Sequence, residues 1–185
     1  MIDNLPQTYL IGLCLLLVII AILVGRQLYK VRKDEMKLIK LEKEDSNTQE
    51  DSAKMYELAS VQLKKRLYPQ ATSTLKQALK KLDGEPEEAK ALIENALGFA
   101  LAAQNDFKSA VIHYKKALTA KADYPVALNN LGFAYQRLLK EDEAYKNYQE
   151  VLKLDPSNKT AISQIKRLER IVGKDKDQLS NKKGF

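Results

Sequence analysis

The sequence predicts an all-α protein, in which one N-terminal transmembrane helix precedes a solenoid of about three helix pairs and a C-terminal capping helix. Three observations support this prediction. An apolar run without any charge occupies residues 9–24, and charged residues are frequent in the rest of the chain. Identical residues also recur 34 positions apart between residues 97 and 152. A length of 185 residues leaves room for one domain with attachments.

The apolar run predicts a transmembrane helix over 9–25, after a short N-terminal tail over 1–8. Its length approaches the roughly 20 residues that span the hydrocarbon core of a bilayer. A cleaved signal peptide is the alternative, but it calls for a basic start, and the first eight residues contain no Lys or Arg. Tyr9 and Tyr29 stand at the two ends of the run, as interface anchors do, unless they are two unrelated tyrosines.

Basic residues follow the run directly and predict its orientation. They are Arg26, Lys30, Arg32 and Lys33, whereas the N-terminal tail carries only Asp3. Because positive charge stays on the side of synthesis, we expect everything after Arg26 on the cytoplasmic or stromal side, next to anionic lipid. Residues 26–50 are predicted as a basic helical extension that ends in a polar linker. A helix lying on the membrane surface is the alternative.

The middle of the chain contains an internal repeat of 34 residues. The repeated pairs are Leu97 and Leu131, Gly98 and Gly132, Phe99 and Phe133, Ala100 and Ala134, Ala110 and Ala144, Tyr114 and Tyr148, and Leu118 and Leu152. A Gly inside a helix costs about 1 kcal/mol relative to Ala. We therefore expect Gly98 and Gly132 to lie where two helices approach closely, so that packing offsets this cost.

The period and the repeated residues resemble the tetratricopeptide-repeat family, in which each repeat is a pair of antiparallel helices. The third repeat (125–158) matches the family at Leu131, Gly132, Tyr135, Ala144, Tyr148 and Pro156, and the second (91–124) at Leu97, Gly98, Ala110 and Tyr114. A degenerate first repeat (52–85) has Ala59 in place of the Gly and Leu75 in place of the aromatic residue. An unrelated helical hairpin over 51–82 is the alternative. The resemblance thus predicts three repeats over 51–158.

The C-terminal end is predicted as a capping helix followed by a tail. Residues 159–172 place Ile162, Ile165 and Leu168 at helical spacing, with basic residues on the other side. Solenoids need an end helix with such a polar back to stay soluble. Residues 173–185 are polar and have no periodicity, so we expect a disordered tail.

The sequence offers no set of residues for catalysis, for a metal or for another cofactor. The chain has one histidine, His113, which we interpret as a surface or packing residue, and one cysteine, Cys14, inside the predicted span. The acidic clusters at 85–88 and 141–143 suit the ends of helices, where carboxylates complement the helix dipole. The formal net charge of +7 is spread along the chain instead of forming a stripe, which argues against a nucleic-acid partner.

The resemblance implies a protein-binding function on the concave face, which the first helix of each repeat lines. The residues that it places there are Tyr56, Ser60, Lys64, Asn95, Phe99, Asn129, Phe133, Gln136 and Arg137. Asn95 and Asn129 stand one repeat apart, as amides that bind an extended segment would. Family members that bind chaperone tails clamp a terminal carboxylate with basic residues and Asn. The matching positions here are Tyr56, Ser60, Ala96, Val126 and Asn130. None of them is basic, so a carboxylate clamp is disfavoured.

The layout of the whole chain resembles the photosystem I assembly protein family of cyanobacteria and red-type plastids. The resemblance rests on the segment IIAILVGRQ (19–27), on LKKRLYPQA (63–71) and on the order of anchor, repeats and capping helix. It implies a single-pass thylakoid protein, with its repeats in the stroma or cytoplasm, that binds photosystem I subunits. A bacterial inner-membrane scaffold for envelope or secretion complexes and a membrane receptor for soluble proteins are the alternatives. The oligomeric state is left open.

Overall fold

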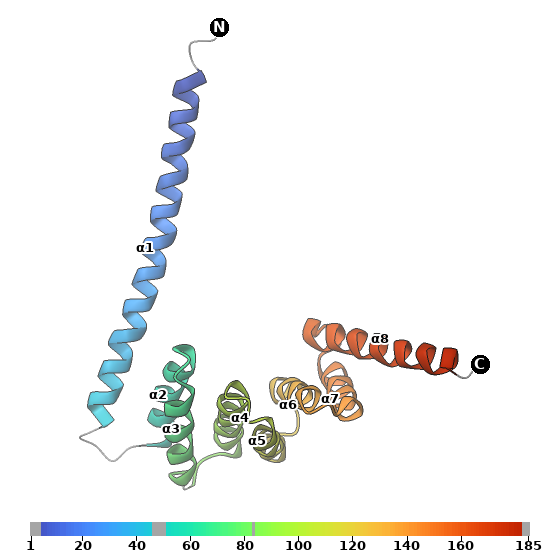
Figure 1. Cartoon of the computed structure of the whole chain (residues 1–185). Coiled ribbons are helices and arrows are strands. Elements are labelled where there is room, and N and C mark those ends of the chain that lie inside the picture. The colour runs from blue at the N-terminus through green and yellow to red at the C-terminus, as the bar shows by residue number, and fades with distance from the viewer. Residues whose placement is uncertain (1–4, 46–50, 83, 183–185) are drawn as a thin grey trace. The chain divides into compact units, whose positions relative to one another are not determined.

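The computed structural model describes residues 5–45, 51–82 and 84–182. These residues form eight helices and no strand, which confirms the all-α prediction. The helices are α1 (Leu5–Asp45), α2 (Ser52–Lys64), α3 (Tyr68–Lys80), α4 (Glu87–Ala103), α5 (Phe107–Ala120), α6 (Pro125–Arg137), α7 (Glu141–Leu154) and α8 (Lys159–Lys182) (Figure 1). The chain divides into two units, Met1–Thr48 with α1 and Gln49–Phe185 with α2 to α8.

Helix α1 is 41 residues long and combines the apolar run with the basic segment after it. Within the described residues, one stretch is long and apolar enough to cross a membrane, Tyr9–Lys33. Its side chains are exposed throughout, as they would be in contact with lipid. The basic segment continues as the same helix to Asp45. Residues 1–4 of the predicted tail and 46–50 of the predicted linker lie outside the described residues.

The second unit is a stack of antiparallel helix pairs, α2 with α3, α4 with α5 and α6 with α7. Each pair packs on the next, so α3 touches α4, α5 touches α6 and α7 touches α8. Among the described residues, α2 also approaches α4, and α4 approaches α6, whereas α3, α5 and α7 make no comparable approaches to one another. The stack therefore curves toward α2, α4 and α6, and these helices line its concave face.

The turn inside each pair is built in the same way. Arg66, Asn105 and Leu139 all have positive φ, at 61°, 65° and 58°. The residue after each of them donates its backbone N–H to a carbonyl five residues earlier, as Leu67 does to Gln62 at 2.9 Å. The equivalent distances are 3.0 Å from Asp106 to Leu101 and 2.9 Å from Lys140 to Tyr135. The pair α2–α3 thus has the same turn as the two clear repeats, as expected for a true first repeat.

The helix glycines lie under tyrosine rings. A Cβ added to Gly98 would stand 2.7 Å from Cδ1 and Cε1 of Tyr114, and one added to Gly132 would stand 2.9 Å from Cε1 of Tyr148. Both tyrosines are almost fully buried, and the alanines that pack beside them, Ala110 and Ala144, have no exposed surface. In each of these two helix pairs, the tyrosine ring on the second helix thus fills the space beside the glycine on the first helix.

One helix end agrees with the sequence analysis and one differs from it. Helix α4 begins at Glu87 with Pro86 as its N-cap, and Glu87 and Glu88 complement the dipole of its first turn, as expected for the acidic cluster at 85–88. Helix α8 continues to Lys182, where we expected disorder from residue 173. Residues 174–182 contain no Pro or Gly, so nothing in this stretch ends the helix. Residues 183–185 of the predicted tail lie outside the described residues.

Candidate protein-binding face

The concave face of the second unit carries apolar side chains that face solvent. Phe99 is 44% exposed on α4, and Phe133 is 45% exposed at the equivalent position of α6. Leu92 and Val126, one residue after the first position of each repeat, are also exposed. A large apolar side chain that remains half-exposed in a folded unit is available for contact with a partner. The structure thus gives the second and third repeats the same pair of apolar contacts.

An aromatic and cationic cluster lies at one end of this face. The rings of Phe107 and Phe133 meet edge to face, with centroids 6.2 Å apart and an interplanar angle of 72°. The guanidinium carbon of Arg137 lies 4.8 Å from the centre of the Phe107 ring. Stacking on an aromatic ring holds the cation in place while it stays exposed to solvent. The sequence analysis missed Phe107, since this residue opens α5 and not a helix of the concave face.

The predicted groove amides are engaged in hydrogen bonds between repeats. Nδ2 of Asn95 donates to the Tyr124 hydroxyl at 3.4 Å, and its Oδ1 accepts from Nδ2 of Asn130 at 3.0 Å. Asn95 is only 9% exposed. Burial raises the pKa of Tyr124, nearby Tyr56 adds to this rise, and the hydrogen bond from Asn95 opposes it. In this structure Asn95 joins α4 to α6 and to the connection before it.

The next interface repeats this arrangement with other residues. Nδ2 of Asn129 donates to Oδ1 of Asn158 at 3.3 Å, and Nε2 of Gln136 donates to Oε1 of Gln164 at 3.2 Å. The Tyr148 hydroxyl donates to Oε1 of Gln136 at 3.1 Å. Oδ1 of Asn129 is buried and accepts no hydrogen bond from a described residue. The side chains of Asn129 and Gln136 thus join α6 to Asn158 and to α8, and within this set of described amides Oδ1 of Asn129 has no hydrogen-bond partner.

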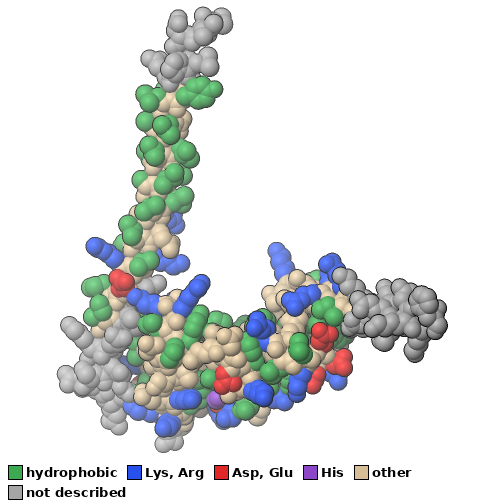
Figure 2. All heavy atoms as spheres, viewed as in Figure 1, with side chains coloured by type: hydrophobic (Ala, Val, Ile, Leu, Met, Phe, Trp, Pro, Cys, Tyr) green, Lys and Arg blue, Asp and Glu red, His purple; other side chains and the backbone are tan. Residues whose placement is uncertain are grey.

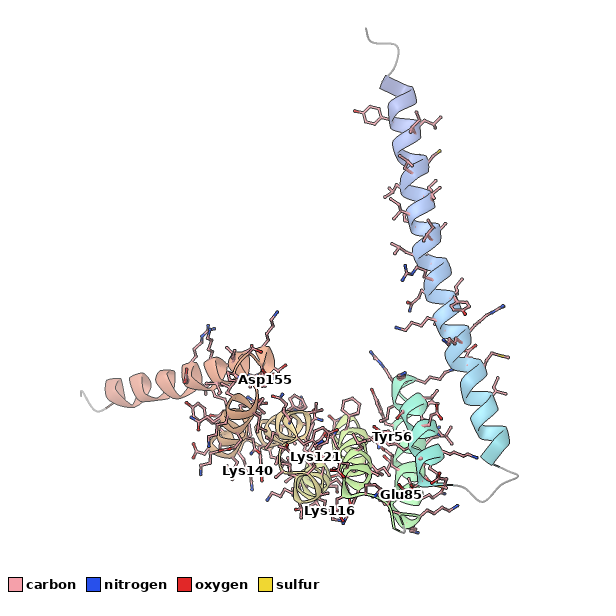
Figure 3. All side chains as sticks on the ribbon, turned by 180° about the vertical axis from the view of Figure 1, so that it is seen from behind. Tyr56, Glu85, Lys116, Lys121, Lys140 and Asp155 are labelled. Carbon is pink, nitrogen blue, oxygen red and sulfur yellow. The ribbon has the colours of Figure 1, made fainter. Side chains whose placement is uncertain are left out.

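The first repeat contributes a more polar part of the face. Tyr56 and Ser60 are half-buried on α2, and the Ser60 hydroxyl donates to the carbonyl of Tyr56 at 2.8 Å. Lys64, in the last turn of α2, is exposed. Figure 3 labels Tyr56 among the side chains of the repeat unit. Helix α6, by contrast, carries Phe133 and Arg137 and contains no Asp or Glu. It therefore adds no negative charge to the concave face.

The structure also forms a buried ionisable pair away from the concave residues. Nδ1 of His113 on α5 lies 2.6 Å from Oε2 of Glu94 on α4, and both side chains are largely buried. The sequence analysis treated His113 as an isolated residue and missed its partner. Glu94 is the fourth residue of the second repeat (91–124), and His113 follows it by 19 residues on the second helix of that repeat. This spacing was the available signal.

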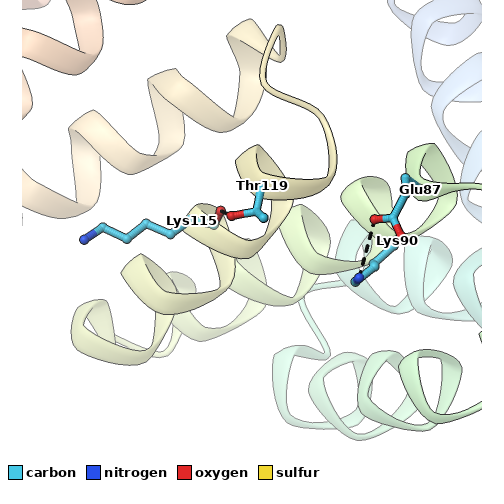
Figure 4. A network of polar contacts seen from close by, with 4 residues as sticks. All are labelled: Glu87, Lys90, Lys115 and Thr119. Carbon is cyan, nitrogen blue, oxygen red and sulfur yellow. Dashed lines mark hydrogen bonds and ion pairs between the residues drawn. The ribbon is translucent and has the colours of Figure 1, made fainter.

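Two acidic residues next to the start of α4 have a structural role or face solvent. Oε1 of Glu85 accepts from the Ser52 hydroxyl at 2.9 Å, and Glu87 forms an exposed ion pair with Lys90 at 3.4 Å (Figure 4). The same view shows Thr119, whose hydroxyl donates to the carbonyl of Lys115 at 3.0 Å. No group of three or more His, Cys, Asp or Glu that suits a metal ion occurs in the part of the chain that the structure describes.

The residues predicted at the membrane lie on α1. Tyr9 and Tyr29 are 73% and 72% exposed, and Arg26, Lys30, Arg32 and Lys33 are exposed as well. Leu23, Gly25 and Tyr29 line a shallow hollow on this helix together with Arg26, Gln27 and Lys30. Gly25 has nothing near the position of a Cβ, so its missing side chain contributes to that hollow.

Two family models match the second unit. The model described as tetratricopeptide repeat matches residues 125–158, and the one described as TPR repeat matches residues 98–138. The first covers the third helix pair, and the second extends from α4 to α6, so together they cover the part of the chain where the sequence pattern is clearest.

Curated relatives match almost the whole chain. A ycf37 protein of Guillardia theta, described as uncharacterized, is 30% identical over 164 residues, or 89% of this chain and 92% of the relative. A ycf37 protein of Cyanophora paradoxa is 30% identical and is covered to 95%. The chloroplastic protein PYG7 of Arabidopsis thaliana, which has a tetratricopeptide-repeat domain, is 30% identical over 85% of this chain and 52% of that protein.

Solved structures share the fold of the second unit. The hetero-tetramer Cut9–Hcn1 of the APC/C matches with a TM-score of 0.69 at 19% identity, over 78% of this chain and 28% of that one. The first TPR of Spaghetti (RPAP3), bound to an HSP90 peptide, matches with a TM-score of 0.61 at 20% identity, over 66% and 96%. The TPR domain of Arabidopsis OM64 matches with a TM-score of 0.60 at 25% identity, over 64% and 94%.

Proposed function

Because the chain belongs to the family of ycf37 tetratricopeptide-repeat proteins, we propose that it is a membrane-anchored scaffold that binds protein subunits of photosystem I during assembly. The chain is a TPR protein-interaction scaffold, and the fold and relatives point to a role without catalysis. The observation that carries the proposal is the match of 30% identity over 89% of this chain with relatives from plastid-bearing lineages.

The described surface supports binding through the concave face. Phe99 and Phe133 provide apolar contacts at the same position of two successive repeats. Arg137 provides a fixed positive charge beside them. Apolar and aromatic contacts with a nearby charge are typical of binding sites for protein segments. Since the groove amides already bond to one another, we infer that a partner is bound mainly through its side chains.

A membrane anchor would raise the efficiency of such a scaffold. Helix α1 carries the stretch Tyr9–Lys33, and the basic residues at its C-terminal end favour the cytoplasmic or stromal side for the repeats. Confinement at a membrane raises the effective concentration of the repeats toward partners in the same bilayer, so moderate affinity suffices. The proposed location is the thylakoid membrane, and Tyr9 and Tyr29 are the proposed interface anchors.

Affinity capture from gently solubilised membranes of the source cell tests this proposal. The tagged full-length chain is expected to retain photosystem I subunits, and the variant Phe99→Ala with Phe133→Ala is expected to lose most of them. The matched control is Leu139→Ala with Leu154→Ala, which removes two exposed side chains near the ends of α7. Capture of envelope or secretion components without photosystem subunits would refute the assembly role. Equal capture by the two variants would refute the concave face as the binding site.

A further inference from the structure

The outer helices of the stack have a strongly uneven charge. Lysines occur on α3 and α5, but neither Tyr68–Lys80 nor Phe107–Ala120 contains an Asp or Glu. Helix α7 is the third outer helix and contains Glu141, Asp142, Glu143 and Glu150 against only two lysines. The outer side of the first two repeats is therefore basic, and that of the third is acidic. Sequence reasoning had assigned the net charge to the segment after the predicted span, to residues 159–172 and to the tail, and did not find this division.

The lysines of α5 lie on the exposed side of that helix. Lys108 and Lys116 are exposed and form no ion pair with any residue in the described ranges. Lys115 is exposed as well, with Nζ 5.9 Å from the centre of the Tyr135 ring. Figure 2 shows Lys and Arg side chains along the lower edge of the repeats, with a small acidic patch beside the histidine, and Figure 3 labels Lys116 at that edge.

The acidic groups near α5 are engaged elsewhere. Asp106 is the N-cap of α5, and its carboxylate accepts from the backbone N–H of Ser109 at 3.1 Å. Glu94 is buried and lies against His113. Neither carboxylate forms an ion pair with one of the three lysines. The hydrogen bonds from Ser109 lower the pKa of Asp106, and the charge of nearby Lys108 adds to this, so one carboxylate offsets part of the positive charge of this side.

An exposed isoleucine lies in the middle of these lysines. Ile112 is 55% exposed and stands four residues after Lys108, three before Lys115 and four before Lys116. Residues three or four apart share one face of a helix. An apolar side chain surrounded by lysines is the composition of helices that lie at the surface of an anionic bilayer. We call Lys108, Ile112, Lys115 and Lys116 the α5 basic face.

We propose that the α5 basic face binds the anionic lipid surface of the membrane that holds α1. This inference rests on the membrane anchor of the proposed function. Covalent geometry supports it, because α1 continues for about 18 Å of helix from Lys33 to Asp45, and the chain between Asp45 and Ser52 adds at most about 25 Å. The start of the repeats thus stays within about 45 Å of the end of the membrane stretch. This confinement makes a weak attraction effective. Contact through an outer helix leaves the concave face open to a protein partner.

The test uses the full-length chain reconstituted into vesicles. In a Cys14→Ser background, Thr119→Cys on α5 carries a dye that is quenched by lipids labelled at the headgroup. The vesicles contain phosphatidylcholine alone or phosphatidylcholine mixed with phosphatidylglycerol, at low and at high salt. We expect strong quenching only with phosphatidylglycerol and at low salt, since salt screens the attraction.

The variant Lys108→Gln, Lys115→Gln and Lys116→Gln is expected to lower the quenching at least threefold, because each lysine near an anionic surface changes partitioning roughly fivefold. The matched control is Lys140→Gln, Lys146→Gln and Lys153→Gln, which removes the same charge at α7 and is expected to keep the quenching. Circular dichroism checks that both variants keep their helices.

Each other outcome overturns the inference. Equal quenching in the two kinds of vesicle, or equal loss in the two triple variants, would exclude lipid binding by α5. Unchanged quenching combined with weaker protein capture by the α5 variant would assign the surface to an acidic protein instead. Retention of the chain during an alkaline wash of the vesicles tests the anchor separately, so that failure of the anchor is distinguished from failure of the α5 basic face.

Discussion

The first and second repeats share one backbone arrangement but fill two of its buried positions differently. The second repeat places Gly98 under the ring of Tyr114, and the first has Ala59 and Leu75 at the equivalent positions, both fully buried. Relative to the second repeat, the first repeat has an additional methyl group at the small residue (Ala59 for Gly98) and no ring at the large one (Leu75 for Tyr114). The comparison teaches that these two positions act as one unit, in which the total volume is kept.

A second difference concerns the polarity of the interior. The second repeat buries the pair Glu94 and His113, whereas the first has Met55 and Thr74 at these positions and the third has Leu128 and Asn147. Met55 and Leu128 are buried, as expected for apolar residues facing the core. The same helix pair thus accepts either an apolar residue or a hydrogen-bonded Glu–His pair at this place.

The largest effect is expected from breaking the buried pair of Glu94 and His113. His113→Ala should lower the free energy of unfolding by about 3 kcal/mol, because Glu94 stays buried without its partner. Chemical denaturation measures this change. The double variant Glu94→Leu with His113→Asn copies the third repeat and should stay within about 1 kcal/mol of the parent, since apolar packing replaces the pair. A single variant that is no less stable than the double one would contradict this reasoning.

The next effect tests the coupled glycine and tyrosine. Gly98→Ala should cost about 2 kcal/mol, because the new Cβ would stand 2.7 Å from two atoms of the Tyr114 ring. Adding Tyr114→Leu recreates the pair of the first repeat and should recover part of this loss, as measured in a double-mutant cycle. Additive effects within about 0.5 kcal/mol would show that the two positions are independent.

The buried tyrosines predict a sensitivity to alkaline pH that the first repeat lacks. Burial raises the pKa of Tyr148 to about 12, although nearby Arg167 opposes the shift, and burial also raises the pKa of Tyr114. The unfolded chain loses its tyrosine protons from about pH 10, so stability should fall as pH rises from about 10 to 12. Tyr148→Phe should reduce this slope by about 1 kcal/mol per pH unit, measured by denaturation at each pH. An unchanged slope would show that Tyr148 is not responsible.

The smallest effect concerns the turn inside the third pair. Leu139 has φ of 58° and is 86% exposed, whereas the equivalent residue of the second repeat is Asn105. Since Asn tolerates positive φ better than Leu, Leu139→Asn should raise the free energy of unfolding by about 0.5 kcal/mol. Leu139→Ala is the control, because it removes the exposed side chain but keeps the backbone strain. Equal gains in both variants would assign the effect to lost apolar exposure.

The sequence predicted those parts of the fold that depend on periodicity. The offset of 34 residues located the second and third helix pairs, and Gly98 and Gly132 indicated the close contact inside each pair. The ends of helices were harder to predict from the sequence, as α8 shows. Polar residues without periodicity are compatible with both a helix and a disordered tail. The identity of Tyr114 and Tyr148 as the rings over the glycines also required the structure.

The candidate site was only partly accessible from sequence. Phe99 and Phe133 were placed on the concave face by repeat alignment, and both are exposed there. The role of Asn95 depends on Asn130, which lies 35 residues away in sequence and reaches it only in the geometry of the stack. Phe107 escaped notice for the same reason, since its contact with Phe133 joins helices of different repeats. To predict contacts between repeats, one must know how far each repeat is rotated relative to the next, and a sequence pattern does not give this rotation.

The arrangement in which each helix packs mainly on its neighbours in the chain has a consequence for hydrogen exchange. Opening α8 breaks contacts chiefly with α7, whereas opening α4 breaks contacts with α3 and α5 together. Local opening therefore requires less free energy at the C-terminal end than in the centre, and the amides of α8 exchange sooner than those of α4. A partner that contacts both α6 and α8 would slow that exchange and make itself detectable without a label.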